Sequence, residues 1–328
     1  MQNIADRPLP YNYDGSTCFM DSLFCAIFQP EKLKVVDAYL LQGVRVNMTN
    51  SDYQDFCKVL EIVANTYRGT LQIKNFDNYV ITFQNIRSVV SYFIKLFTNV
   101  NFSHGQHDPV DVFEALMRIF NVGGVFSTKK TVQSEYSNGK VTKTTSIDQM
   151  FRYSVHHFLV SGGTRFEAMF PSVDTLSVDS EEKGDEVLKQ QRTLVEFAGG
   201  PVLCLTREVM SNFNPVVYGR WSASTQSCVL PLLNTVKKCI QWYELQSVLC
   251  WKGHQSTSRG VDLGHYVCYT FHEDEPNKWW FYNDMVNIGN NTATCVAVES
   301  PEGHPEYRSS ETGVMFLYAL ISKLPADI

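Results

Sequence analysis

No Cys-x-x-Cys pair occurs in this chain of 328 residues, although it contains nine cysteines. Zinc ribbons are commonly built from two such pairs, so we expect no structural zinc, and nothing in the composition indicates another cofactor. The first eight residues lack an apolar core, and no apolar run approaches the length of a membrane span. We therefore expect no secretory signal, no membrane span, and reduced thiols in the cytoplasm or nucleus.

Basic residues are in the minority, with 28 Lys and Arg against 34 Asp and Glu and a formal net charge of −6. This balance argues against nucleic acid or an anionic membrane as the main partner, and it is compatible with a basic protein segment. Hydrophobic residues make up 44% of the chain and charged residues 19%, which is typical of a globular protein. The length is sufficient to bury a sizeable core.

The first third of the chain carries apolar residues at helical spacing. Helices are predicted where these residues recur every three or four positions, at 18–28, 51–67 and 84–97. A fourth helix should begin after Asp108, which can cap it, with Pro109 in the first turn. It should run to about Phe120.

After Gly124 the pattern changes to β. The runs 125–136 and 141–147 flank Ser137-Asn138-Gly139-Lys140, a strong signal for a hairpin turn. Further strands are predicted at residues 154–160, 166–170, 202–205, 243–251, 266–271, 279–283 and 314–321. We interpret the acidic run 179–186 as a solvated loop. A helical part followed by a β-rich part is an α+β layout.

Cys18 is the candidate nucleophile. It follows the turn-forming run Gly15-Ser16-Thr17 and should lie in the first turn of the helix at 18–28. A helix N-terminus and a nearby histidine both favour the thiolate, which is the reactive form of cysteine. The alternative is a buried structural cysteine, which is our interpretation of Cys25, two turns further along the same face.

His265 is the candidate general base, because histidine titrates near neutral pH and can exchange a proton with Cys18. A third residue should orient the imidazole, and Asn283 or Asp284 can do so from the end of a predicted strand. The alternative for these two is a plain Asn-Asp turn. Together the residues predict a cysteine hydrolase.

Three segments resemble motifs of the ubiquitin-specific proteases. Residues 16–23, Ser-Thr-Cys-Phe-Met-Asp-Ser-Leu, resemble the cysteine box of that family. Residues 264–284, with Gly-His-Tyr-Val, Trp279 and Phe-Tyr-Asn-Asp, resemble its histidine box. Between them, residues 106–113, Gln-His-Asp-Pro-Val-Asp-Val-Phe, resemble its Gln-Gln-Asp-x-x-Glu-Phe helix start. The motif details are most similar to the cylindromatosis-type deubiquitinases.

The resemblance implies a papain-like α+β fold of the ubiquitin-specific protease type. Residues 1–328 would form a single catalytic domain, with a helical thumb over about 1–124 and β-rich fingers and palm over about 125–328. The implied activity is hydrolysis of the bond after the C-terminal glycine of ubiquitin, through a thioester on Cys18. Ubiquitin or polyubiquitin and ubiquitinated proteins would be the partners. Two alternatives stay open, a protease for a ubiquitin-like modifier and a catalytically weak ubiquitin-binding scaffold.

The same resemblance implies roles around the nucleophile and base. Aligning Trp279 with the Trp-x-x-Phe of the family places Asn283 at the third triad position and Asp284 directly after it. Gly264 and Tyr266 would border a narrow passage for the Gly-Gly end of the substrate.

Three further residues, Gln106, Asp108 and Asp111, match positions that contact the ubiquitin tail in the family. Carboxylates suit the arginines of that tail because they accept charge-assisted hydrogen bonds. The alternative is that Asp108 and Asp111 only cap their helix and complement its dipole.

The oxyanion hole departs from the family pattern. An asparagine is expected five residues before the nucleophile, where this chain has Tyr13, and Asn12 lies one place off. The Asn12 amide, the Tyr13 hydroxyl, or the backbone amides of Thr17 and Cys18 alone are the three open possibilities. Loss of a side-chain donor lowers the rate on the order of a hundredfold, which motivates the weakly catalytic alternative.

Overall fold

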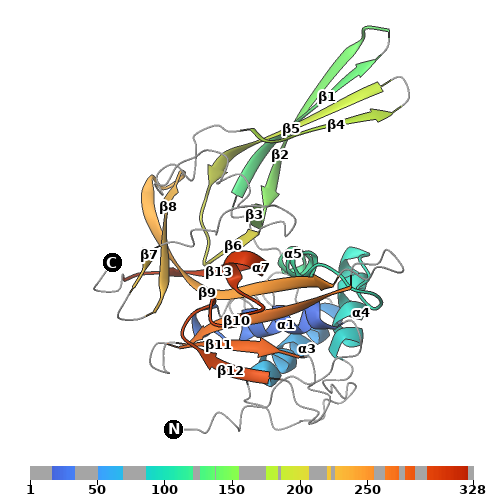
Figure 1. Cartoon of the computed structure of the whole chain (residues 1–328). Helices are drawn as coiled ribbons and strands as arrows, with labels where there is room; N and C mark the ends of the chain where they lie inside the picture. The colour runs from blue at the N-terminus through green and yellow to red at the C-terminus, as the bar shows by residue number, and fades with distance from the viewer. Residues whose placement is uncertain are drawn as a thin grey trace.

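The computed structural model describes residues 17–33, 51–68, 86–120, 126–136, 138–154, 175–183, 186–206, 220–222, 226–254, 263–272, 278–284 and 294–323. Helices dominate the first part of the chain and antiparallel sheets the rest, so the α+β prediction is confirmed (Figure 1). Within the described part, no helix is both long and apolar enough to cross a membrane.

The helices lie where the apolar spacing predicts them. They are α1 (Cys18–Phe28), the short η2 (Glu31–Leu33), α3 (Ser51–Tyr67), α4 (Ile86–Thr98) and α5 (Pro109–Ile119). Asp108 caps α5 as predicted, since its Oδ1 accepts a hydrogen bond from the backbone N–H of Val110 at 2.9 Å. A short helix that we did not predict, α7 (Ser309–Thr312), precedes the last strand.

Two sheets follow. The smaller has four strands in the order β2-β1-β5-β4, and it extends away from the helices and the larger sheet in Figure 1. Its strands are β1 (Phe126–Tyr136), β2 (Val141–Met150), β4 (Thr175–Lys183) and β5 (Glu186–Phe197).

The larger sheet has nine strands, with the main order β12-β11-β10-β9-β13-β6-β3. Strand β8 also pairs with β9, and β7 pairs with β8. Its strands are β3 (Arg152–Ser154), β6 (Val202–Thr206), β7 (Arg220–Trp221), β8 (Cys228–Asn234), β9 (Cys239–His254), β10 (Leu263–His272), β11 (Lys278–Asn283), β12 (Thr294–Val298) and β13 (Gly313–Ile321).

The acidic run 179–186 is not the loop that we predicted. Most of it lies in β4 and at the start of β5, which pair in antiparallel register, for example Lys183 with Glu186 and Ser180 with Lys189. Backbone hydrogen bonds of a long hairpin therefore outweigh the weak β-propensity of the charged side chains. The predicted strand 166–170 and nearly all of 154–160 lie outside the described residues.

Helix α1 is the centre of the core. All its residues are buried except Asp21, which is only partly buried, because the helix packs between α3, α5 and the strands β9 and β10. A helix buried on nearly every side needs apolar residues all round, and Phe19, Phe24 and Phe28 supply much of that surface. The Ser247 hydroxyl of β9 donates to the Ala26 carbonyl at 2.6 Å. The last turn of α1 is thus held against strand β9.

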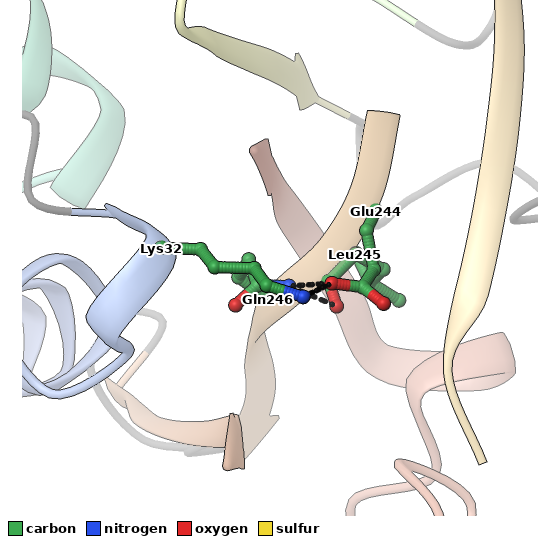
Figure 2. A network of polar contacts seen from close by, with 4 residues as sticks. All are labelled: Lys32, Glu244, Leu245 and Gln246. Carbon is green, nitrogen blue, oxygen red and sulfur yellow. Dashed lines mark hydrogen bonds and ion pairs between the residues drawn. The ribbon is translucent and has the colours of Figure 1, made fainter. Parts of the chain in front are cut away.

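A polar network ties the helical part to the same strand (Figure 2). Lys32 Nζ lies 2.6 Å from Glu244 Oε2, and the Gln246 side chain donates to the same oxygen at 2.9 Å. Glu244 is buried, so its charge needs both donors. The network joins residues 212 positions apart in the chain.

Candidate active site

Cys18 is the first residue of α1, as predicted. The Thr17 carbonyl accepts hydrogen bonds from the N–H groups of Met20 and Asp21, which begins the helical ladder directly beside the thiol. Cys18 is only 1% exposed, so it does not face an open cleft, contrary to our expectation for a first-turn residue.

Burial has a chemical consequence for this thiol. Loss of hydration, with a smaller contribution from the charge of Asp284, raises the pKa of Cys18 to about 12. The backbone N–H groups of Tyr266 and Phe19 act in the opposite direction by donating to the sulfur. Burial of the thiol therefore opposes the effect that we expect from the helix terminus, which favours a thiolate. The Tyr266 contact places the start of β10 against Cys18.

His265 lies on β10 and meets both predicted orienting residues. Its Nε2 is 2.8 Å from Asn283 Oδ1 and 3.3 Å from Asp284 Oδ1. The antiparallel pairing of β10 with β11 brings the end of β11 to the histidine, which explains why residues 18 positions apart converge. His265 and Asp284 are both buried. The Asn283 contact is the shorter of the two.

Gln106 lies between the nucleophile and β10. Its Nε2 donates to the Gly264 carbonyl at 2.7 Å and lies 3.9 Å from Cys18 Sγ. Its Oε1 accepts from the Gly264 N–H at 3.4 Å. One side-chain amide therefore bonds to both backbone groups of Gly264 and also reaches the sulfur.

A buried arginine, which sequence reasoning missed, holds the segment that carries Gln106. Arg87 on α4 donates through Nε to the Phe102 carbonyl at 2.9 Å and through Nη2 to the Gly105 carbonyl. Its guanidinium also lies over the ring of Phe19, 5.1 Å from the centroid. A charged residue on the mostly apolar α4 was the available signal.

Gly264 has no space for a side chain. A Cβ atom there would come within 2.1 Å of Trp251 Nε1, because the indole of Trp251 on β9 covers both Gly264 and its cross-strand partner Gly253. Trp251, which the sequence did not single out, thus lies directly against Gly264.

Residues predicted to contact the tail lie near the same point. Burial raises the pKa of Tyr266, and the charges of Asp108, Cys18 and Asp111 add to this effect. Tyr266 thus lies within electrostatic range of the nucleophile and of both carboxylates. Asp108 and Asp111 are exposed at the start of α5.

Asp21 is a second residue that sequence reasoning missed. Its Oδ1 accepts a 2.6 Å hydrogen bond from the Tyr67 hydroxyl on α3. Its carboxyl group also lies within hydrogen-bonding reach of Asp284. An acidic residue one turn after Cys18, in an otherwise apolar helix, was the signal that could have identified it.

Two predicted residues, Asn12 and Tyr13, lie outside the described residues. The oxyanion donor is therefore open among the possibilities given above. In the described ranges, no three His, Cys, Asp or Glu residues are grouped so that they could hold a metal ion.

Comparisons with known proteins give the family and the fold. Residues 11–318 match the family described as ubiquitin carboxyl-terminal hydrolase. None of the curated proteins matches the sequence. Among solved structures, the SAGA DUB module of Ubp8, Sgf11, Sus1 and Sgf73 bound to ubiquitin aldehyde is similar, with 14% identity and a TM-score of 0.51 over 99% of this chain and 72% of that chain. The same module with a substituted Ubp8, bound to monoubiquitin, gives 14% identity and a TM-score of 0.53 over 97% and 71%. At this identity the similarity shows a shared fold.

Proposed function

The chain belongs to the ubiquitin carboxyl-terminal hydrolase family of thiol-dependent deubiquitinases, and on that premise we propose that Cys18, His265 and Asn283 perform the hydrolysis. The observation that carries the assignment is the 2.8 Å contact of His265 Nε2 with Asn283 Oδ1, beside a Tyr266 N–H that donates to Cys18. A nucleophile, a base and a residue that orients the base are thus held on α1, β10 and β11.

The proposed reaction proceeds in two halves. Since Asn283 engages Nε2, we assign Nδ1 of His265 to the proton exchange with Cys18. The Cys18 thiol gives its proton to the imidazole while the sulfur attacks the carbonyl carbon of the terminal ubiquitin glycine. The imidazolium then protonates the leaving amine, and a thioester forms. Water activated by His265 attacks the thioester, which releases the carboxylate and restores the thiol.

Substrate binding has a specific task in this scheme. Burial, which raises the pKa of Cys18, disfavours the thiolate in this arrangement. The surroundings of the Cys18 thiol would change if the substrate displaced Gln106 from Gly264 and placed a peptide group beside the sulfur. We propose that thiolate formation depends on this displacement, so that the enzyme is activated when the tail enters.

The oxyanion donors are also part of the proposal. The backbone amides at Thr17 and Cys18, with Asn12 or Tyr13 as a side-chain donor, are the groups that sequence reasoning offers. Gln106 Nε2 is a further donor, supported by its 3.9 Å distance from Cys18 Sγ.

Tail recognition follows from the same surface. We assign Gln106, Asp108 and Asp111 to the tail, with Gly264 and Tyr266 bordering the passage. The exposed carboxylates at the start of α5 suit an arginine-rich segment, and the indole that covers Gly264 suits a substrate end without side chains.

The finer assignments rest on the sequence motifs. We propose that residues 1–328 act as one catalytic domain of cylindromatosis type, with a thumb over about 1–124 and fingers and palm beyond it. A cytoplasmic or nuclear location suits a reaction that needs a reduced Cys18 thiol. Ubiquitinated proteins and polyubiquitin are the proposed substrates.

An electrophilic probe built on the C-terminus of ubiquitin tests the assignment. We expect one covalent adduct, located on Cys18 by peptide mass spectrometry, and no adduct with Cys18→Ala. The matched control is Cys25→Ala, because Cys25 is equally buried on the same helix; it should label normally and unfold about 1 kcal/mol more easily. Labelling only by probes of ubiquitin-like modifiers would favour the second substrate class. Tight ubiquitin binding without labelling would favour the scaffold, and an adduct on Cys25 would overturn the assignment.

A further inference from the structure

Two carboxyl groups meet behind the candidate triad. Asp284 Oδ1 lies 3.3 Å from His265 Nε2, and the Asp284 carboxyl group is also within hydrogen-bonding reach of Asp21. Residue Asp21 as a whole is partly buried, but its Oδ2 and both oxygens of Asp284 are shielded from solvent. The described residues supply none of these three oxygens with a hydrogen bond of ordinary geometry.

Ionising both carboxyl groups of such a pair has a high cost in free energy. Two carboxylates in contact repel each other, and burial removes the water that would screen them, so one group keeps a proton and donates it to the other. Burial raises the pKa of Asp21 to about 6, and burial together with the charge of Asp21 raises the pKa of Asp284 well above its ordinary value.

The surroundings decide which partner holds the charge. The Tyr67 hydroxyl donates to Asp21 at 2.6 Å, a Thr17 hydrogen bond acts in the same direction, and the positive charge of Arg87 also favours an ionised Asp21. Among the described residues, the titratable and charged groups that face the pair are Tyr67 on α3, Arg87 on α4, Cys18 and Cys25 on α1, His265 on β10, and Tyr307 before α7.

We infer that Asp21 is a positioning residue, which shares one proton with Asp284 and thereby keeps Asp284 a neutral acid beside His265. The inference rests on the proposed roles of Cys18 and His265. The neutral Asp284 accepts from the imidazole through Oδ1 and donates its proton to the Asp21 carboxylate. The single negative charge of the pair therefore lies on Asp21, and it is not placed directly against the imidazole.

This arrangement affects the reactivity of Cys18. A full charge on Asp284 would stabilise the imidazolium at short range, and it would also oppose formation of the thiolate, because a negative charge at Asp284 raises the pKa of Cys18. Asp21 keeps both effects small. The shared proton thus sets the pH range in which thiol and imidazole can exchange a proton.

The pH dependence of Cys18 alkylation by iodoacetamide tests the inference without ubiquitin. In Asp21→Asn, the amide donates to Asp284 and leaves it as a lone carboxylate beside His265. We expect both limbs of the profile, that is, each rise or fall of the alkylation rate with pH, to move to higher pH by roughly half to one pH unit. Adding Asp284→Asn removes that charge and should reverse the shift, whereas damage to packing by Asp21→Asn would not be reversed.

Tyr67→Phe is the second arm and removes a single hydroxyl. Without this donor the Asp21 carboxylate is less stable, so the pair remains uncharged up to a higher pH. Both limbs of the alkylation profile should then move to lower pH. Asp55→Asn, a partly exposed aspartate on α3, is the matched control and should leave the profile unchanged. If Asp21→Asn does not fold, the downward shift in Tyr67→Phe decides the question.

The shared proton is excluded if the limbs stay in place in both Asp21→Asn and Tyr67→Phe, or if both variants shift them in the same direction. The same variants are assayed for release of a fluorogenic amide from the ubiquitin C-terminus. Absence of ubiquitin turnover in the wild type would overturn the proposed function, while opposite shifts in the alkylation profile would still support the role of Asp21.

Discussion

The side chain of Gln106 forms two hydrogen bonds with the backbone of Gly264, donating to its carbonyl at 2.7 Å and accepting from its N–H at 3.4 Å. This is how a peptide group of a neighbouring strand would bond to β10. Gln106 therefore occupies the strand edge that an extended substrate tail would use, and the same amide lies 3.9 Å from Cys18 Sγ. A residue that substrate displaces and that then donates to the reacting atoms should affect both binding and turnover.

Replacing Gln106 separates these two contributions. Gln106→Ala removes the donor, and a lost hydrogen bond of about 0.5–1.5 kcal/mol corresponds to a roughly two- to tenfold loss in kcat. Gln106→Glu has nearly the same shape but places a carboxylate against the Gly264 carbonyl and the sulfur, so its loss should exceed tenfold. Steady-state kinetics on ubiquitin with a fluorogenic C-terminal amide measures both. A rate increase in Gln106→Ala would show that the amide only obstructs the passage.

The two partners of His265 should differ in importance. Asn283 Oδ1 is the nearer acceptor, and we infer that Asp284 is held neutral. We expect Asn283→Ala to lower kcat at least tenfold and more than Asp284→Ala does, because only the first leaves the imidazole without its shorter hydrogen bond. Asn283→Asp, which keeps an acceptor in place, serves as the conservative control. The reverse order of kcat losses would move the orienting role to Asp284.

The Asp21–Asp284 pair should also make stability depend on pH. The pKa of Asp21 is raised to about 6, so the folded protein binds a proton that the unfolded chain releases near its ordinary value of 3.8. The contribution of Asp21 to folding stability is therefore greatest below that ordinary value, falls as pH rises toward about 6, and changes little above it. Asp284 acts in the same direction.

Asp21→Asn removes this dependence. At pH 7.5 the variant should be more stable than the wild type by on the order of 1–3 kcal/mol, whereas near pH 4 the two should be similar. Urea unfolding at both values measures the difference, with Asp55→Asn as the control. Equal stability differences at the two pH values would mean that folding does not raise the pKa of Asp21.

Sequence patterns predicted the helices and the proximity of His265 to Asn283 and Asp284 more fully than they predicted what surrounds these residues. Helical spacing in 51–67 and the cap at Asp108 are local properties, so they can be identified without the fold. The proximity of Asp21 to Asp284, and of Trp251 to Gly264, depends on packing between α1, β9, β10 and the end of β11. Such long-range contacts leave no periodic signal.

The loop prediction for the segment that forms the β4–β5 hairpin was wrong for a related reason. Charges at 179–186 indicated solvent, and solvent exposure was then interpreted as a loop. An extended pair of strands can also present charged side chains to water, because the backbone hydrogen bonds are made between the strands. Composition therefore could not distinguish a hairpin from a loop there.

The start of α5 provides the most direct test of substrate recognition. Asp108 and Asp111 are exposed, so they are available to the arginines of an incoming tail. Charge reversal in Asp111→Arg should lower kcat/KM for ubiquitin substrates roughly ten- to hundredfold, mainly through KM, if one or two charge-assisted hydrogen bonds of about 1.5–3 kcal/mol are lost.

Asp108 requires a control for its structural role, since its Oδ1 caps the helix through the Val110 N–H. Asp108→Asn keeps a competent cap and removes the charge, whereas Asp108→Ala removes both. If Asp108 binds the ubiquitin tail, both variants should raise KM while iodoacetamide still alkylates Cys18 at the wild-type rate. If it is only a cap, Asp108→Asn should behave as the wild type, and Asp108→Ala should lose about 1 kcal/mol of stability with unchanged KM. Unchanged KM in Asp111→Arg as well would mean that the tail is bound elsewhere.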